Sequence, residues 1–357
     1  MIYVAVFNLM VVLRLALANA IRMRGQLYIP LLIALFLFSA FRFEVGCDWT
    51  GYLNQYRIYG RLSFSEVLEQ PREVLWVSLF TLQTWLELPY PWINVFSSLI
   101  FFVGLHAMAR RQPDALAFLV LLFPILIINM PMSGIRQGAA IGVMFLAFNA
   151  FVDRKTILFV MFTLLAGALH SSALVFLLLA PLVRGNYSRR RLLLSGILAL
   201  PGAFLLLQGA AAETASARYI QTDRDAAGAV FRVGLVFITG LYFLMFVRRK
   251  WEREFPSDFK LAIIGSFLMI LLFLLLPISS IIADRLAYYL LPIQAMMFAR
   301  VPFLQISNDR KLHVIFPYAM IGITFLVWTA ISWHFNRCYI PYQTWLFGFP
   351  DQIRYVF

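Results

Sequence analysis

Long apolar segments recur along the whole chain, and they constrain its fold more than any other feature. A helix needs about 20 mostly apolar residues to cross the hydrocarbon part of a bilayer. Soluble domains carry about 25% charged residues, whereas only 13% of these 357 residues are charged and 62% are hydrophobic. We therefore predict an all-α polytopic membrane protein that forms a single transmembrane domain over residues 1–357. The twelve predicted crossings are Ile2–Ala20, Leu27–Phe41, Trp92–Ala109, Ala115–Met132, Ile135–Val152, Thr156–Leu169, Ser172–Val183, Leu192–Gln208, Ala229–Val247, Leu261–Ile278, Leu286–Ala299 and Leu312–Ser332.

The apolar stretch 73–88 is not counted among these crossings. Ser78, Thr81, Thr84 and Glu87 follow one another at every third position, which places a polar stripe along one side of a helix. We interpret the stretch as an amphipathic or re-entrant helix at the membrane surface, within a long loop that covers residues 42–91. If this stretch does not cross the membrane, every basic cluster falls on the same side.

The net charge of +13 is distributed unevenly over the predicted topology. In this topology, 18 of the 30 basic residues lie in loops on one side of the membrane, together with only six acidic residues. Cytoplasmic loops are enriched in Lys and Arg, so we expect both termini, the loops 42–91 and 209–228 and the tail 333–357 to face outward. Because the excess positive charge is explained by membrane orientation, it no longer argues for a nucleic-acid partner.

Neither cysteine belongs to a pattern that fits a metal. Cys47 and Cys338 form no CxxC pair and have no zinc-type spacing with histidine, so we predict no metal and no cofactor. Both are expected on the oxidising side of the membrane. The sequence leaves open whether they pair.

Several ionisable residues fall at the outer ends of predicted crossings. Arg136 follows Ser133-Gly134, where a helix begins, so its guanidinium and the helix N-terminus together suit an anionic oxygen. Arg42 and Arg285 also suit anions, although a snorkelling anchor explains each of them equally well. His170 lies at the tip of two short apolar segments, which often line a polar cavity; a simple structural turn is the alternative.

The order of short motifs resembles a known family. They are Arg-x-x-x-Gly-x-Asp-aromatic-x-x-Tyr at residues 42–52, an acid opening the next helix at Glu73, Gly-Ile-Arg-Gln at 134–137, His-Ser-Ser-Ala-Leu at 170–174, Arg-x-x-x-Tyr at 285–289, and Pro-Tyr at 341–342. This order is similar to that of the EpsG-type branch of the Wzy polysaccharide polymerases. The chain departs from the pattern at Cys47, where Thr is usual, and at Trp49, where Tyr or Phe is more frequent.

The resemblance implies a bacterial inner-membrane enzyme with a periplasmic active site. Such polymerases move a growing glycan from undecaprenyl pyrophosphate onto the next lipid-linked repeat unit, and their architecture is similar to that of O-antigen ligases and related GT-C-like glycosyltransferases. Donor and acceptor are lipid-linked oligosaccharides in the bilayer, and a Wzz-type chain-length regulator is an expected partner. The sugars, the linkage and the choice between O-antigen and exopolysaccharide stay open.

Roles for individual residues follow from the resemblance and the chemistry. We expect guanidinium groups to converge on the pyrophosphate without a metal, and aromatic residues to contact sugars, although interfacial aromatics are more often membrane anchors. The expected substrate-binding residues are Arg42, Arg136, Gln137, Arg285, Tyr52, Tyr289 and Tyr342.

A base is also needed, to take the proton from the acceptor hydroxyl in a single inverting displacement. His170 is favoured, because its ordinary pKa lies near neutral pH. Asp48 is the second candidate and Glu73 the third.

Other functions compete with this interpretation. A transporter or flippase for lipid-linked oligosaccharides would need outward arginines too, but it predicts charges at mid-membrane depth and an inner gate. An O-antigen ligase shares the expected fold and chemistry, and an O-acetyltransferase with an outward histidine is a further alternative.

Overall fold

The computed structural model describes residues 2–70, 73–184, 228–306 and 310–349. Among these residues there is no strand, only an isolated bridge between Arg42 and Thr344, so the all-α prediction is confirmed for the described chain. The predicted crossing Leu192–Gln208 and residues 209–227 of the predicted short loop lie outside the described residues. The chain divides into two compact units.

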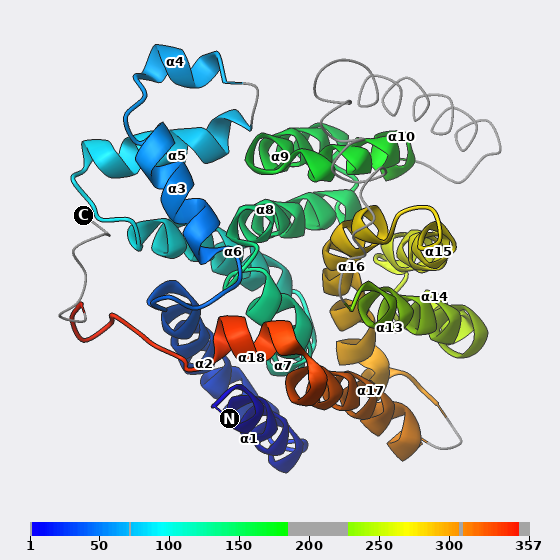
Figure 1. Cartoon of the computed structure of the whole chain (residues 1–357). Coiled ribbons are helices and arrows are strands. Elements are labelled where there is room, and N and C mark those ends of the chain that lie inside the picture. Colours follow the sequence, from blue (N-terminus) through cyan, green and yellow to red (C-terminus); the bar gives the residue numbers. More distant parts are fainter. Residues whose placement is uncertain (1, 71–72, 185–227, 307–309, 350–357) are drawn as a thin grey trace. The chain divides into compact units, whose positions relative to one another are not determined.

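Unit 1 comprises residues 1–143, 166–171 and 318–357 (Figure 1). Its elements are α1 (Ile2–Ala16), α2 (Ile21–Ala40), α3 (Trp49–Tyr59), α4 (Phe64–Leu68), α5 (Val74–Trp85), α6 (Trp92–Ala109), α7 (Ala115–Leu122), the π-helical η1 (Phe123–Ile127) and α18 (Trp333–Tyr339). Three further helices pass from one unit to the other: α8 (Ile135–Val152), α9 (Thr156–Leu169) and α17 (Arg310–Ile331).

Unit 2 comprises residues 144–165 and 172–317. Its elements are the 3-10 helix η2 (Ser171–Leu179), whose first residue belongs to unit 1, α10 (Ala180–Val183), α13 (Ala229–Tyr242), the π-helical η3 (Phe243–Val247), α14 (Arg248–Glu254), α15 (Phe259–Leu275), α16 (Ser280–Arg300) and the 3-10 helix η4 (Val301–Phe303). Helices α13, α15 and α16 pack against one another and form the core of this unit.

Five of the described helices are long and apolar enough to cross a membrane. They are α2, α6, α8, the continuous helix Ala229–Glu254 and α17. Large apolar side chains such as Leu9, Ile33, Leu164 and Leu274 are exposed on the outside of helices, which is the arrangement that lipid contact favours. The structure thus agrees with a polytopic membrane protein, while the count of twelve crossings and the GT-C-like architecture stay predictions.

Helices α6 and α8 come into backbone contact in unit 1. A Cβ atom added at Gly104 would lie 1.7 Å from the carbonyl oxygen of Gly142, so neither position has room for a side chain. Small residues allow two helices in a membrane to approach this closely. The contact fixes the first half of α8 relative to α6.

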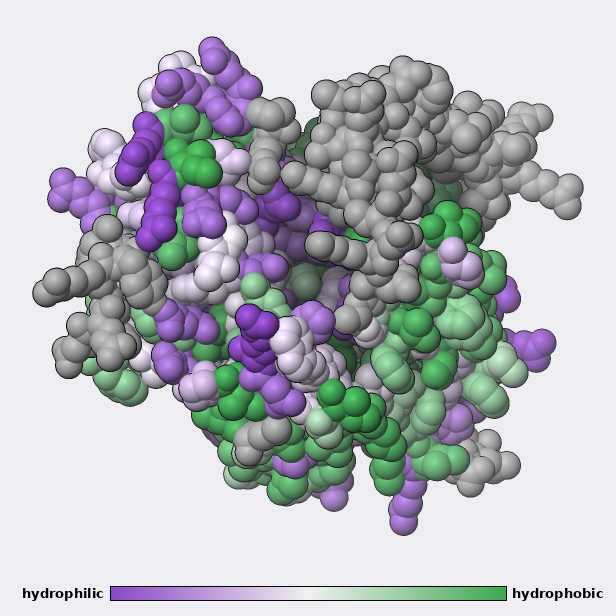
Figure 2. Space-filling view, in the orientation of Figure 1, coloured by the Kyte–Doolittle hydropathy of each residue, from purple (hydrophilic) through white to green (hydrophobic). Residues whose placement is uncertain are grey.

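The stretch between α2 and α6 leaves and returns at the same end of unit 1. Arg42, just after α2, donates a hydrogen bond to Asn94 in the first turn of α6. Within the stretch 73–88 the structure has the helix α5, which is 12 residues long and packs against α3 and α6; its location at the membrane surface stays a prediction. We call this end of unit 1 the site end; hydrophilic side chains gather there over α3 and α4 (Figure 2).

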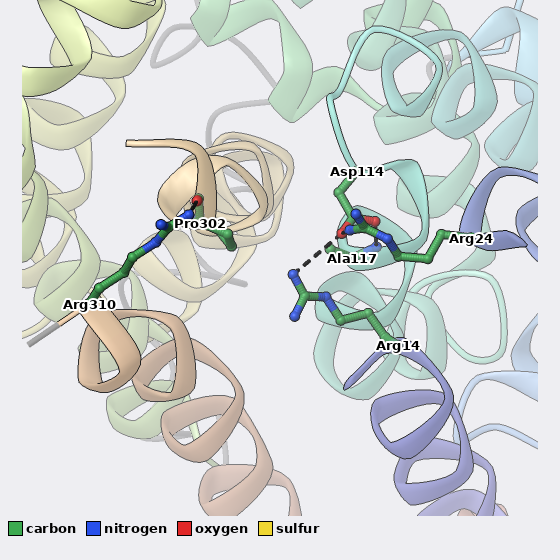
Figure 3. A network of polar contacts seen from close by, with 6 residues as sticks. All are labelled: Arg14, Arg24, Asp114, Ala117, Pro302 and Arg310. Carbon is green, nitrogen blue, oxygen red and sulfur yellow. Dashed lines mark hydrogen bonds and ion pairs between the residues drawn. The ribbon is translucent and has the colours of Figure 1, made fainter. Parts of the chain in front are cut away.

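The opposite end of unit 1 holds a buried cluster of three charges. Arg14 at the end of α1 and Arg24 in α2 both form ion pairs with Asp114, which caps α7 by accepting a hydrogen bond from the Ala117 N–H (Figure 3). The cluster is also covered by Tyr318, whose ring lies 5.3 Å from the Arg14 guanidinium carbon. One carboxylate thus ties α1, α2 and α7 together.

Candidate functional site

The loop that follows α2 packs onto the break before α8. Gly46 has φ +104°, and a Cβ atom there would lie 2.0 Å from the carbonyl oxygen of Met132. The next residue, Cys47, donates its backbone N–H to the Ser133 hydroxyl at 3.1 Å. The glycine of the first motif is therefore needed for its backbone conformation and for the close approach. It brings α3 beside the N-terminus of α8.

Arg42 packs against this loop and donates three hydrogen bonds within unit 1. Its Nε donates to the carbonyl oxygen of Val45 at 3.0 Å, and its two terminal nitrogens donate to the Ser39 carbonyl at 2.9 Å and to Asn94 Oδ1 at 2.7 Å. Only 1% of the residue is exposed. Burial lowers the pKa of the Arg42 guanidinium to about 10, with nearby tyrosines such as Tyr90 opposing the shift. The group is thus still charged at neutral pH, and it joins the end of α2 to α6.

Three donors converge on the carboxylate of Glu73 at the site end. Arg136, the second residue of α8, donates from Nη1 to Glu73 Oε2 at 3.1 Å. Ser171 donates both its backbone N–H and its hydroxyl to Glu73 Oε1, each at 3.1 Å. The side chains of Arg136 and Glu73 are 21% and 13% exposed, so this cluster is partly open to its surroundings. We call these three donors the cradle.

The contacts of Glu73 change its acidity. Burial raises the pKa of the Glu73 carboxyl, but the Arg136 charge, the hydrogen bonds from the backbone N–H groups of Glu73 and Ser171, and the nearby His170 lower it more. The net pKa lies below that of an ordinary glutamate, so the carboxylate is ionised at neutral pH and weakly basic. Glu73 immediately precedes α5 and makes no side-chain hydrogen bond to that helix.

Four other residues expected in the site also belong to unit 1. His170 is 5% exposed and follows α9, where its N–H donates to the Ala166 carbonyl. Tyr52 is buried in α3, and its hydroxyl accepts a hydrogen bond from the Arg136 backbone N–H at 3.5 Å. Gln137 is buried in the first turn of α8, while Asp48 is exposed just before α3.

An aromatic cluster holds this part of unit 1 together. The Tyr90 hydroxyl donates to the Trp49 carbonyl at 2.7 Å, and Trp76 Nε1 donates to Gln55 at 3.0 Å. The Tyr52 ring packs edge-on against Trp76, with 5.4 Å between ring centroids. The cluster thereby fixes α3 and α5 on the start of α6. A sugar-binding role for Tyr52 stays a prediction.

The C-terminal tail is attached to the same loop. Phe43 donates its N–H to the Gln343 carbonyl at 2.9 Å, and Tyr342 donates its hydroxyl to the Phe38 carbonyl at 2.9 Å. The Tyr342 ring also stacks on Phe38, with 4.3 Å between centroids. Its place in the structure is thus against the end of α2, and its contact with sugar stays a prediction.

A disulfide bond adds a covalent link to this attachment. Cys47 in the loop and Cys338 in α18 are bonded, with their Cα atoms 4.8 Å apart. The Gly46 N–H also donates to the Cys338 carbonyl at 2.7 Å. The sequence left this pairing open, because the separation of the two residues in space was not known.

The remaining expected residues belong to unit 2. Arg285 lies in the second turn of α16, and the buried Tyr289 shares a hydrogen bond of 3.1 Å between its hydroxyl and that of Ser172. Because Arg136 belongs to unit 1, the expected meeting of Arg136 and Arg285 stays a prediction.

Unit 2 contains a charged pair that sequence reasoning missed. Arg232 in α13 forms a two-pronged ion pair with Asp284, with Nε–Oδ1 2.6 Å and Nη2–Oδ2 2.9 Å. The guanidinium carbon also lies 5.5 Å from the centre of the Tyr288 ring. The signal was present in the sequence: Arg232 falls inside the predicted crossing Ala229–Val247, where a charge requires a partner.

These observations define a class of protein. The described chain is all-helical, has long apolar helices, and carries an arginine, a carboxylate and a serine in a partly open cluster at the start of α8 in unit 1. Residues 26–344 match the model of the EpsG family, so the chain belongs to the EpsG family. No curated protein and no solved structure matches it. The family is associated with polysaccharide polymerase activity, and together with the apolar helices it indicates a membrane protein.

Proposed function

We propose that this protein is a periplasm-facing glycan polymerase of the bacterial inner membrane. It transfers a growing polysaccharide from undecaprenyl pyrophosphate onto a lipid-linked repeat unit. The observation that carries the proposal is the cradle, because the Arg136 guanidinium at the start of α8 and the backbone N–H and hydroxyl of Ser171 are donors that suit a phosphate. The Arg136 guanidinium would stabilise the charge that develops on the leaving diphosphate.

The disulfide supports an outward-facing site. Disulfide bonds persist in oxidising compartments such as the periplasm and are rare in the cytosol. The bond joins Cys47 to Cys338 beside the loop that leads into α3, so it lies at the site end. The positive charges predicted for the cytoplasmic side indicate the same orientation.

The proposed reaction is a single displacement at the anomeric carbon. The acceptor hydroxyl forms the new bond to this carbon, the bond to the diphosphate oxygen breaks, and the hydroxyl proton passes to a base. His170 is favoured for that role, because Glu73 is held ionised by its donors and is therefore a weak base. Asp48, exposed just before α3, is the second candidate.

Reconstitution tests the function. The purified protein is placed in liposomes with lipid-linked repeat units in the presence of a chelator, and the products are separated by size. A ladder of longer glycans is the expected result. A single joined product on a different acceptor would show that the protein is a ligase. Movement of the lipid across the bilayer without a new bond would show that it is a flippase.

A further inference from the structure

The cradle already holds an anion that belongs to the chain. The two oxygens of Glu73 accept three hydrogen bonds from Arg136 and Ser171, each at 3.1 Å. A phosphate group offers the same donors more acceptor oxygens and more negative charge than a carboxylate does. Both anions cannot use the same donors at once.

The Arg136 guanidinium has a further donor that Glu73 does not use. Its Nε atom is buried and has no hydrogen-bond partner. A buried N–H without an acceptor is unfavourable, so an anion that reaches it gains an interaction that the Glu73 carboxylate leaves unmade. This second observation indicates that the cradle fits a larger anion than the one that occupies it.

Glu73 is placed where its side chain can leave without disturbing the fold. It precedes α5, and the first turn of that helix receives no side-chain hydrogen bond from it. Its side chain is 13% exposed, so it lies at the boundary of the cluster. Release of the carboxylate costs the contacts with Arg136 and Ser171 and leaves the helix intact.

We propose that Glu73 is an internal competitor that occupies the diphosphate site until a lipid-linked donor displaces it. This inference rests on the proposed function and names its regulation. Competition with Glu73 lowers the apparent affinity of the site for diphosphate, and the return of the Glu73 carboxylate to the donors lets the diphosphate product leave. Displacement also frees a carboxylate beside the reacting groups only when a donor is bound.

Binding of a diphosphate analogue tests the proposal without any glycan. Methylenediphosphonate is titrated calorimetrically into the full-length protein in detergent, and Glu73→Gln is compared with the wild type. Glu73→Gln removes the competing charge and is expected to bind about tenfold more tightly, which corresponds to roughly 1.4 kcal/mol. Glu69→Gln makes the same change of charge at an exposed position nearby and is expected to bind like the wild type.

A second variant keeps the test decisive if Glu73→Gln folds poorly. Glu73→Asp retains the charge but is one methylene shorter, so it reaches the donors less well and is also expected to bind the analogue more tightly. Unchanged or weaker binding in the variant that folds would overturn the proposal.

The outcomes separate this inference from the function. If the Glu73 variants bind the analogue more tightly but the wild-type protein makes no glycan ladder, Glu73 is a competitor and the protein is not a polymerase. If the wild-type protein makes a ladder but the Glu73 variants bind the analogue as the wild type does, the protein is a polymerase and Glu73 is not a competitor.

Discussion

Cys47 and Cys338 are 291 residues apart in the sequence and are joined by a disulfide bond. The bond fastens α18 to the loop that also contacts Ser133 at the break before α8. The first motif, the last motif and the start of α8 are therefore parts of one attachment. This arrangement explains how residues near the two ends of the chain support the same cluster.

The oxidation state of these cysteines tests the orientation of the site end. In intact cells we expect neither cysteine to react with a maleimide polymer until a reductant is added. After reduction both thiols should react, and each attached polymer should slow the protein on a gel by one increment. In Cys47→Ser, the Cys338 thiol should react without reductant. Thiols that stay unreactive in intact cells after reduction, and react only once detergent has permeabilised the inner membrane, would contradict a site end in the periplasm.

Replacement of Gly46 tests the close approach of the loop to α8. Gly46→Ala adds a Cβ atom 2.0 Å from the Met132 carbonyl and forces φ +104° on a residue with a side chain. We expect a loss of at least about 1–2 kcal/mol in stability and a loss of activity, measured by thermal unfolding and by the glycan ladder.

Gly51→Ala is the matched control. Gly51 lies inside α3, and an added Cβ atom meets nothing within 4 Å. Because alanine favours a helix, this variant should be as stable as the wild type or more stable by about 0.5–1 kcal/mol. Equal damage by both substitutions would show that the contact with Met132 is not the cause.

Arg42 tests a structural role against direct binding of the diphosphate. Lysine cannot replace the three donors that reach Ser39, Val45 and Asn94, so Arg42→Lys should cost about 1–3 kcal/mol of stability. The exposed Arg61→Lys should cost little. Unchanged stability of Arg42→Lys with a large rise in KM for the donor would assign Arg42 to the substrate instead.

The proton acceptor is tested by separate substitutions. His170→Ala should lower kcat by roughly 10²–10⁴-fold while the protein stays folded, the usual contribution of a general base. Asp48→Asn should lower it less. Retained activity in both variants would remove both residues from this role.

The apolar pattern predicted several helices to the residue. Trp92–Ala109, Ile135–Val152 and Thr156–Leu169 begin and end as expected, because charged residues, prolines or turns bound each apolar run. The first helix was predicted to reach Ala20 but ends at Ala16, where the chain turns before α2. Periodicity is a local signal, and it locates elements better than their ends.

The contacts inside the site could not be predicted in this way. The motifs identified Arg136 and Glu73 as separate candidates, yet they are 63 positions apart, and nothing in a local pattern indicates that they form an ion pair. The burial of Arg42 and the pair between Arg232 and Asp284 also depend on how helices pack. Side-chain partners across a fold are set by tertiary structure.

The central claim is that the Arg136 guanidinium binds the diphosphate as it leaves. Arg136→Lys keeps the charge and loses the planar set of donors, so its kcat/KM for lipid-linked repeat units in liposomes tests the claim most directly. We predict a drop of roughly 10²–10³-fold, as expected for the loss of one donor to a developing negative charge, with the thermal stability retained. Turnover equal to that of the wild type would contradict the account.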